Sequence, residues 1–61
     1  MAPFFTTQQL QTILDLIPAC VYWKSLEGNF LGCNRAVVDI FGKKSIGEVL
    51  GRTSYELFDE L

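Results

Sequence analysis

The chain has 61 residues, of which 49% are hydrophobic and 20% charged, and its net charge at pH 7 is −2. This apolar content excludes intrinsic disorder, because disordered chains lack the surface whose burial offsets ordering entropy. The five basic residues are scattered, which excludes a nucleic-acid-binding surface built on clustered Lys and Arg. A chain of this length forms at most one small domain and buries only ~60% of its unfolded surface.

The first predicted element is a helix over residues 8–17, which follows an N-terminal lead of residues 1–7. Its apolar residues recur at spacings that place them on one helical face: Leu10, Ile13, Leu14 and Ile17. Thr6 or Thr7 provides a hydroxyl that can accept a hydrogen bond from an unpaired N–H of the first turn. Pro18 disfavours helical geometry in the residue before it, so we expect the helix to end there.

The second predicted element is a β-hairpin over residues 20–33. Residues 20–24 are rich in β-branched and aromatic side chains, which favours a strand. Gly28 and Asn29 can adopt positive φ and mark a turn, and residues 30–33 form the return strand. A hairpin alone is marginally stable in water, so other elements must cover it.

Residues 35–61 are predicted to be a helical segment. The Asn34 side chain is expected to cap a helix that begins at the next residue, and Gly42 suits the left-handed position after its end. The buried face of this helix is expected to contain Ala36, Val37, Ile40 and Phe41. Residues 45–48 and 53–56 each have the spacing of a capping box, which predicts two further short helices.

The predicted fold class is therefore α+β: an N-terminal helix, a hairpin and two or three short helices, in one domain over residues 1–61. Apolar residues continue to Leu61. We therefore expect a domain that is cut short and that lacks a partner surface for its core.

Catalytic and metal chemistry find little support in the residue types. The sequence has no histidine, the commonest general base near neutral pH, and nothing in it would activate a thiolate. Structural zinc takes four Cys or His ligands, and the chain has only Cys20 and Cys33. We expect both thiols to be buried, as small apolar side chains usually are. We also expect them to be free, because the hairpin register places Tyr22, and not Cys20, opposite Cys33.

No segment approaches the length of about 20 apolar residues that a membrane span needs. The N-terminus lacks the basic start and continuous apolar stretch of a secretory signal. We therefore expect a cytoplasmic protein without a membrane span.

Tyr22 and Trp23 are adjacent on a predicted strand, so their side chains point to opposite faces of the sheet. Either both residues serve only packing, or one lines a ligand cavity while the other docks a helix or a second subunit. Lys24 has two interpretations as well: a solvated strand end, or a cation that reaches into a pocket for an acidic ligand.

The order of these motifs resembles a PAS domain over about residues 10–61. The family pattern is a helix ending in Ile-Pro, a strand, a turn with Gly, a strand ending in Asn, a helix closed by Gly, and a Ser-capped short helix before Gly-Lys/Arg-Thr. The chain matches this pattern at Ile17-Pro18, Glu27-Gly28, Asn34, Phe41-Gly42, Ser45 and Gly51-Arg52-Thr53. Residues 55–58 also resemble PAS sequences of bacterial sensor histidine kinases.

The resemblance implies a five-stranded antiparallel sheet with helices over one face and a small ligand or cofactor between them. This chain has only the first two strands, so the last three strands are missing. The resemblance also implies a homo-oligomer, often formed through the N-terminal helix, and a signal that passes to a downstream output domain.

The family's strand parity implies that Tyr22 and Lys24 face the cavity, and that Val21 and Trp23 lie on the outer sheet face. The pocket-lining candidates are Tyr22, Lys24, Cys33, Val37, Phe41, Leu50 and Phe58. The interface candidates are Leu10, Ile13, Leu14, Ile17, Val21 and Trp23.

The resemblance implies no cofactor in this chain itself. The light-sensing flavin branch has a reactive cysteine where this sequence has Ser54, so covalent flavin photochemistry is not expected. Haem-binding members take their iron ligand from a later histidine. We therefore expect a non-catalytic sensory module, or alternatively a self-associating interaction module that binds no ligand.

Overall fold

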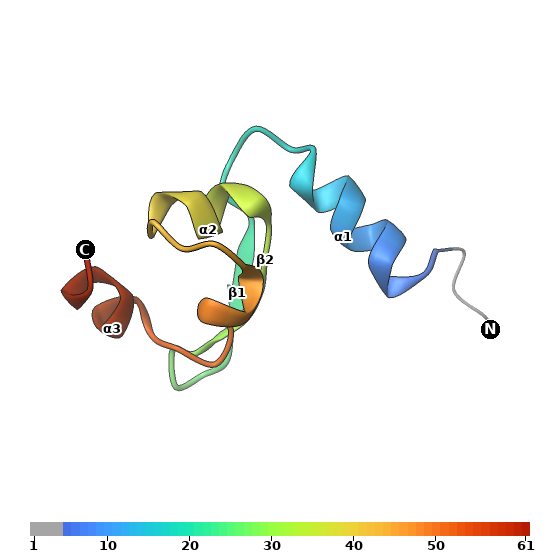
Figure 1. The fold of residues 1–61 in the computed structure, drawn as a ribbon. Helices are drawn as coiled ribbons and strands as arrows, with labels where there is room; N and C mark the ends of the chain where they lie inside the picture. Colours follow the sequence, from blue (N-terminus) through green and yellow to red (C-terminus); the bar gives the residue numbers. More distant parts are fainter. Residues whose placement is uncertain (1–4) are drawn as a thin grey trace.

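A computed structural model describes residues 5–61. Its elements are α1 (Thr7–Asp15), β1 (Tyr22–Lys24), β2 (Phe30–Cys33), α2 (Arg35–Ile40), the 3₁₀ turn η1 (Ile46–Glu48) and α3 (Ser54–Asp59). The two strands form an antiparallel hairpin, with α1 on one side of it and α2 and α3 on the other (Figure 1). The predicted α+β class, helices with a two-stranded hairpin, is confirmed.

Helix α1 begins where the sequence predicts it, and Thr6 is the capping residue. The Thr6 hydroxyl accepts a hydrogen bond from the Gln9 N–H at 3.1 Å, and the Gln9 side chain accepts one from the Thr6 N–H at 2.8 Å. The helix ends at Asp15, two residues before the predicted end at residue 17. None of its residues is buried, so packing adds little to what capping contributes. Residues 1–4 of the predicted lead lie outside the described residues.

The hairpin is shorter at its start than predicted, because β1 begins at Tyr22 rather than at residue 20. Tyr22 lies opposite Cys33, as predicted, and Trp23 lies opposite Gly32. The register then shifts, so that Lys24 lies opposite Phe30. This bulge places Phe30 on the same face as Cys33 although the two are three positions apart.

The two outer edges of the hairpin differ. The outer edge of β2 pairs with residues 51–53: the Phe30 N–H donates to the Arg52 carbonyl at 2.8 Å, and the Gly51 N–H donates to the Phe30 carbonyl at 2.8 Å. The outer edge of β1 has no neighbouring strand within residues 5–61.

The core lies between the inner face of the hairpin and the helices that follow it. Its buried apolar residues are Phe30, Cys33, Val37, Val38, Phe41, Val49 and Leu57. The prediction of the buried face of α2 is correct for Val37 and Phe41 and wrong for Ile40, which is 60% exposed. Ala36 is only half-buried, and the buried Val38 was not predicted. Val38 turns inward where its carbonyl accepts the Lys43 N–H and the chain folds back toward η1.

Asn34 does not cap α2 with its side chain, contrary to the prediction. Its side chain is completely buried. The amide donates to the carbonyls of Leu14 at 3.1 Å and Ala19 at 2.7 Å, and its oxygen accepts the Val21 N–H at 3.1 Å. The Asp15 carboxylate takes over the capping of α2, because it accepts the Arg35 N–H at 2.7 Å.

The remaining turns follow the sequence prediction. The Thr53 hydroxyl accepts the Glu56 N–H at 3.2 Å, and the Glu56 carboxylate accepts the Thr53 N–H at 3.1 Å. The Glu48 carboxylate likewise accepts the Lys44 and Ser45 N–H groups, and these bonds hold the pKa of Glu48 below its ordinary value. Gly28, Gly42 and Gly51 have φ of 89°, 68° and 82°, which a residue with a side chain adopts only with strain.

Candidate functional site: a cavity beside the hairpin

Alternation along β1 separates two surfaces of the molecule. Tyr22 points toward α2 and α3, where its ring meets Phe30 edge to face with centroids 5.5 Å apart. Trp23 points the other way and lies over Gly32, beside α1. The two adjacent side chains therefore reach different layers of the fold, as strand geometry requires.

A cavity of about 220 Å³ lies on the Tyr22 side of the hairpin. It is lined by Cys20, Tyr22, Phe30, Val37, Ile40, Phe41, Ser54 and Phe58. These residues come from the hairpin and its lead-in, from α2 and from α3. The walls are mainly apolar, because the only hydroxyl groups among these side chains are those of Tyr22 and Ser54.

Four aromatic rings form a continuous series along this cavity. After the Tyr22–Phe30 pair, Phe30 meets Phe41 with centroids 5.9 Å apart, and Phe41 meets Phe58 at 5.1 Å. All three contacts have an interplanar angle of 71°, the edge-to-face geometry that aromatic pairs prefer. Phe30 and Phe41 are buried, whereas Tyr22 and Phe58 are 53% and 58% exposed and form the open part of the wall.

Lys24 lies at the rim of the cavity. Its Nζ is 4.7 Å from the centroid of the Phe30 ring and 5.5 Å from that of Tyr22. It donates a hydrogen bond to the Ser54 hydroxyl at 2.6 Å. The ammonium group therefore rests on aromatic faces, to which cations are attracted, and it donates to the Ser54 hydroxyl in the lining.

The structure brings four predicted pocket residues together at the cavity: Tyr22, Val37, Phe41 and Phe58. Lys24 lies at its rim. Cys33 and Leu50 are not among the lining residues. Cys33 is wholly buried in the core, and burial, with the nearby Asp15 carboxylate, raises the pKa of its thiol.

Four lining residues were not predicted: Cys20, Phe30, Ile40 and Ser54. Phe30 was missed because strict alternation from Cys33 does not allow for the bulge in the hairpin. Cys20 was expected to be buried and is exposed, because it precedes β1 and lies at the open side of the cavity. Ser54 follows Thr53 in the second predicted capping box, so its place at the start of a short helix is evident from the sequence.

The predicted interface residues divide between two places. A hollow of about 350 Å³ between α1 and β1 is lined by Thr7, Leu10, Gln11, Ile13, Leu14 and Trp23. Ile17 and Val21 are not among these residues, since they lie in the connection between α1 and β1. Leu10, Ile13 and Trp23 are 47%, 46% and 48% exposed, which leaves an apolar surface open to solvent.

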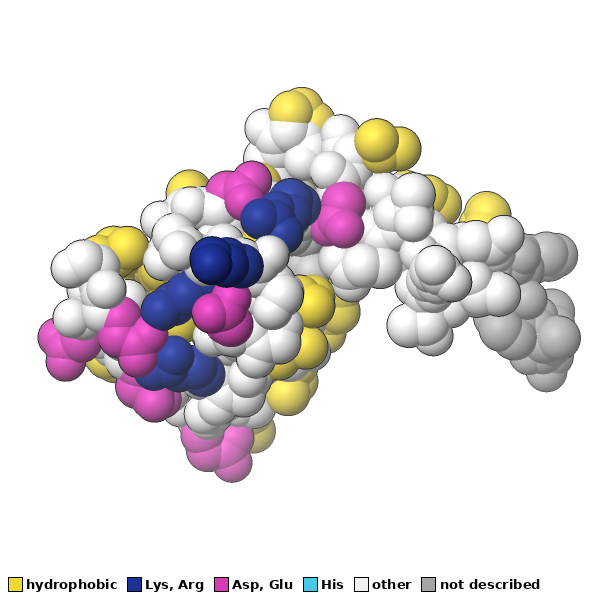
Figure 2. All heavy atoms as spheres, viewed as in Figure 1, with side chains coloured by type: hydrophobic (Ala, Val, Ile, Leu, Met, Phe, Trp, Pro, Cys, Tyr) yellow, Lys and Arg dark blue, Asp and Glu magenta, His cyan; other side chains and the backbone are white. Residues whose placement is uncertain are grey.

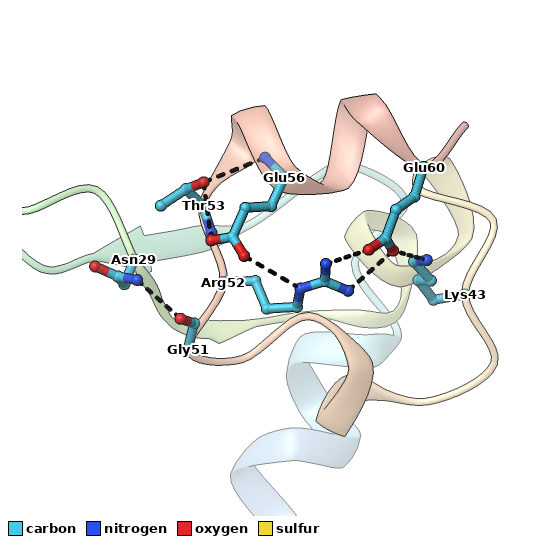
Figure 3. A network of polar contacts seen from close by, with 7 residues as sticks. All are labelled: Asn29, Lys43, Gly51, Arg52, Thr53, Glu56 and Glu60. Carbon is cyan, nitrogen blue, oxygen red and sulfur yellow. Dashed lines mark hydrogen bonds and ion pairs between the residues drawn. The ribbon is translucent and has the colours of Figure 1, made fainter.

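A charged network holds α3 against the rest of the domain (Figure 3). The Arg52 guanidinium forms a two-pronged ion pair with the Glu60 carboxylate, which also binds the Lys43 ammonium. These two cations lower the pKa of Glu60 from 4.5 to about 2. On the face shown in Figure 2, basic side chains lie next to acidic ones, so their charges are largely paired there.

Within residues 5–61 no group of three or more His, Cys, Asp or Glu side chains is arranged to hold a metal ion. In the same residues, no helix has the length and apolar character needed to cross a bilayer.

Comparison with known proteins identifies one family. The sequence model of the PAS fold matches residues 8–61, almost the whole chain. Neither the comparison with curated proteins nor that with solved structures found a match.

Proposed function

Because the chain belongs to the PAS family, we propose that it is a non-catalytic, cytoplasmic sensory module. It passes its signal to a downstream output domain of the kind found in bacterial sensor histidine kinases. The observation that carries this proposal is the position of Tyr22 and Trp23 on β1. One lines the apolar cavity, and the next faces the hollow beside α1.

The signal is a shift between conformations with different cavity shapes. A ligand that enters the cavity displaces Tyr22, and the hairpin then changes the position of Trp23 against α1. The same equilibrium responds to a partner subunit that covers α1, because coupling between two sites is reciprocal.

The test is to fill the cavity and to observe α1. Cys20 lines the cavity and is exposed, whereas Cys33 is buried, so a benzyl thiosulfonate reagent attaches a ring at Cys20 alone. We expect amide NMR shift changes to extend through β1 to residues 10–14 and the Trp23 indole to respond. Changes confined to the residues around Cys20 would contradict the relay. Cys20→Ser treated in the same way is the control.

The second candidate function is self-association without a ligand. It is favoured by α1, in which no residue is buried and whose apolar side chains share a hollow with Trp23. A second copy would cover Leu10, Ile13, Leu14, Ile17, Val21 and Trp23. Size-exclusion chromatography with light scattering is expected to show a dimer that Ile13→Glu dissociates. A monomer at concentrations of about 1 mM, a threshold for very weak association, would rule this function out.

A further inference from the structure

The shape and lining of the cavity define the body of a ligand. The volume is about 220 Å³, and a cavity of roughly 150 Å³ already holds benzene. The rings of Tyr22, Phe30, Phe41 and Phe58 line this space, which is open to solvent beside Tyr22 and Phe58. The body that fits is therefore about one aromatic ring, or an aliphatic group of similar size.

The charge at the rim defines the rest of the ligand. The Lys24 ammonium has no carboxylate within ion-pair distance in the described residues, whereas Arg35, Lys43 and Arg52 are all paired with acidic side chains. An ammonium group has three donors, and Lys24 uses one of them on Ser54. Ser54 accepts that bond, so its own hydroxyl hydrogen is still available for donation.

Both groups therefore offer donors, one of them charged, at the edge of an apolar space. We propose that the cavity binds a small monocarboxylate whose apolar body packs among the four rings, with the carboxylate on Lys24 and Ser54. This inference rests on the proposed sensory function, and it names the ligand class of the same site.

Other ligand classes fit these residues less well. A dicarboxylate would find no second uncompensated cation, because none of the residues that line this cavity is basic and Arg35, Lys43 and Arg52 are paired with acidic side chains. Lys44 has no ion pair in the described residues, but it lines a separate hollow beside Asp15 and Asn34. A neutral arene would leave the ammonium group without a charged partner, so it gains no charge-assisted hydrogen bond.

The experiment uses two probes of the same shape, benzoate and benzamide, titrated into the full chain and followed by NMR. We expect benzoate to shift the Tyr22 and Phe58 ring signals and to bind at least about fivefold more tightly than benzamide, as a charge-assisted contact predicts. Lys24→Met keeps the apolar stem and is expected to abolish this preference. Lys44→Met removes an equal charge elsewhere and is expected to preserve it.

The outcomes separate this inference from the function on which it rests. Equal binding of benzoate and benzamide, or a preference that survives in Lys24→Met, overturns the assignment of a carboxylate and leaves the cavity as a ligand site. If neither probe binds up to about 10 mM, where affinity falls below that of very weak ligands, the ligand class is overturned, whereas the relay from the cavity to α1 is decided by the ring attached at Cys20.

Discussion

The indole ring of Trp23 occupies the space in which a side chain on Gly32 would stand. The two residues lie opposite each other across the hairpin, and an added Cβ would fall well inside contact distance of the ring. Gly32→Ala is therefore expected to displace the indole and to lower the free energy of unfolding by about 1–3 kcal/mol, as overpacking does. Because Trp23 is the single tryptophan of the chain, its fluorescence emission reports the displacement directly.

The matched control is Gly47→Ala, since the nearest atom to an added Cβ there is the Ser45 hydroxyl at 3.8 Å. Its effect on the free energy of unfolding is expected to stay within about 0.5 kcal/mol. An unchanged Trp23 emission in Gly32→Ala would show that the ring does not rest on this glycine.

Asn34 links three segments through buried hydrogen bonds, so its removal is expected to be costly. Asn34→Ala leaves the carbonyls of Leu14 and Ala19 and the Val21 N–H without their partner. We expect the free energy of unfolding, measured by urea denaturation, to fall by about 2–3 kcal/mol. Asn29→Ala removes an exposed bond to the Gly51 carbonyl and is expected to cost about 0.5–1.5 kcal/mol. Equal losses of unfolding free energy in Asn34→Ala and Asn29→Ala would show that burial does not make the Asn34 hydrogen bonds more important than an exposed one.

The Glu60 ion pairs predict how stability depends on acid. The pKa of Glu60 is lowered from 4.5 to about 2 in the folded chain. The folded state therefore binds this proton less readily than the unfolded state, and its stabilising effect is complete above pH 4.5 and is lost as the pH falls toward 2. Thermal unfolding followed by circular dichroism is expected to show a falling midpoint across this window.

Glu60→Gln removes the charge and is expected to flatten the dependence in that pH window. Asp59→Asn is the matched control, because the adjacent Asp59 takes part in no ion pair among the described residues. If Asp59→Asn flattens the curve as much as Glu60→Gln does, the network in Figure 3 is not the cause.

The two thiols are expected to react very differently. Cys20 is exposed, and Cys33 is completely buried with a raised pKa, so less of it is present as reactive thiolate. A colorimetric disulfide reagent is expected to modify one thiol per chain under native conditions and the second only in denaturant. Cys20→Ser is expected to remove the native reaction. Rapid modification of both thiols in the wild type would show that the core around Cys33 opens readily.

The features that sequence predicts correctly here are those set by short-range rules. The Thr6 and Thr53 caps depend on residues three positions apart, and the positive φ of Gly42 depends on one residue. The pairing of Tyr22 with Cys33 follows from the length of the turn between them. Membership of the PAS family likewise depends on the order of local motifs along the chain, and the family model matches residues 8–61.

The features that the sequence predicts poorly depend on contacts between distant segments. Asn34 has the residue type of a helix cap, but the carbonyls after α1 lie close enough to claim its amide, and Asp15 takes over the cap. Phe30 reaches the cavity only through a bulge, and a bulge has no signature in the pattern of apolar residues. About half of the candidate site is therefore predictable from the sequence. The residues whose direction follows from strand or helix periodicity are evident, and those whose position depends on contacts between distant segments are not.

The attachment of α1 gives it the mechanics of a lever. Its bonds to the body come from Gln11, Leu14 and Asp15, in the second half of the helix, while its first turn contains no buried residue. The helix rises about 1.5 Å per residue, so the arm from Gln11 back to Thr7 is roughly 6 Å long, and a rotation of about 10° at the pivot moves its far end by about 1 Å. A displacement too small to alter the core around Asn34 is thus enlarged at the tip of α1, where an attached segment would detect it as a change in position.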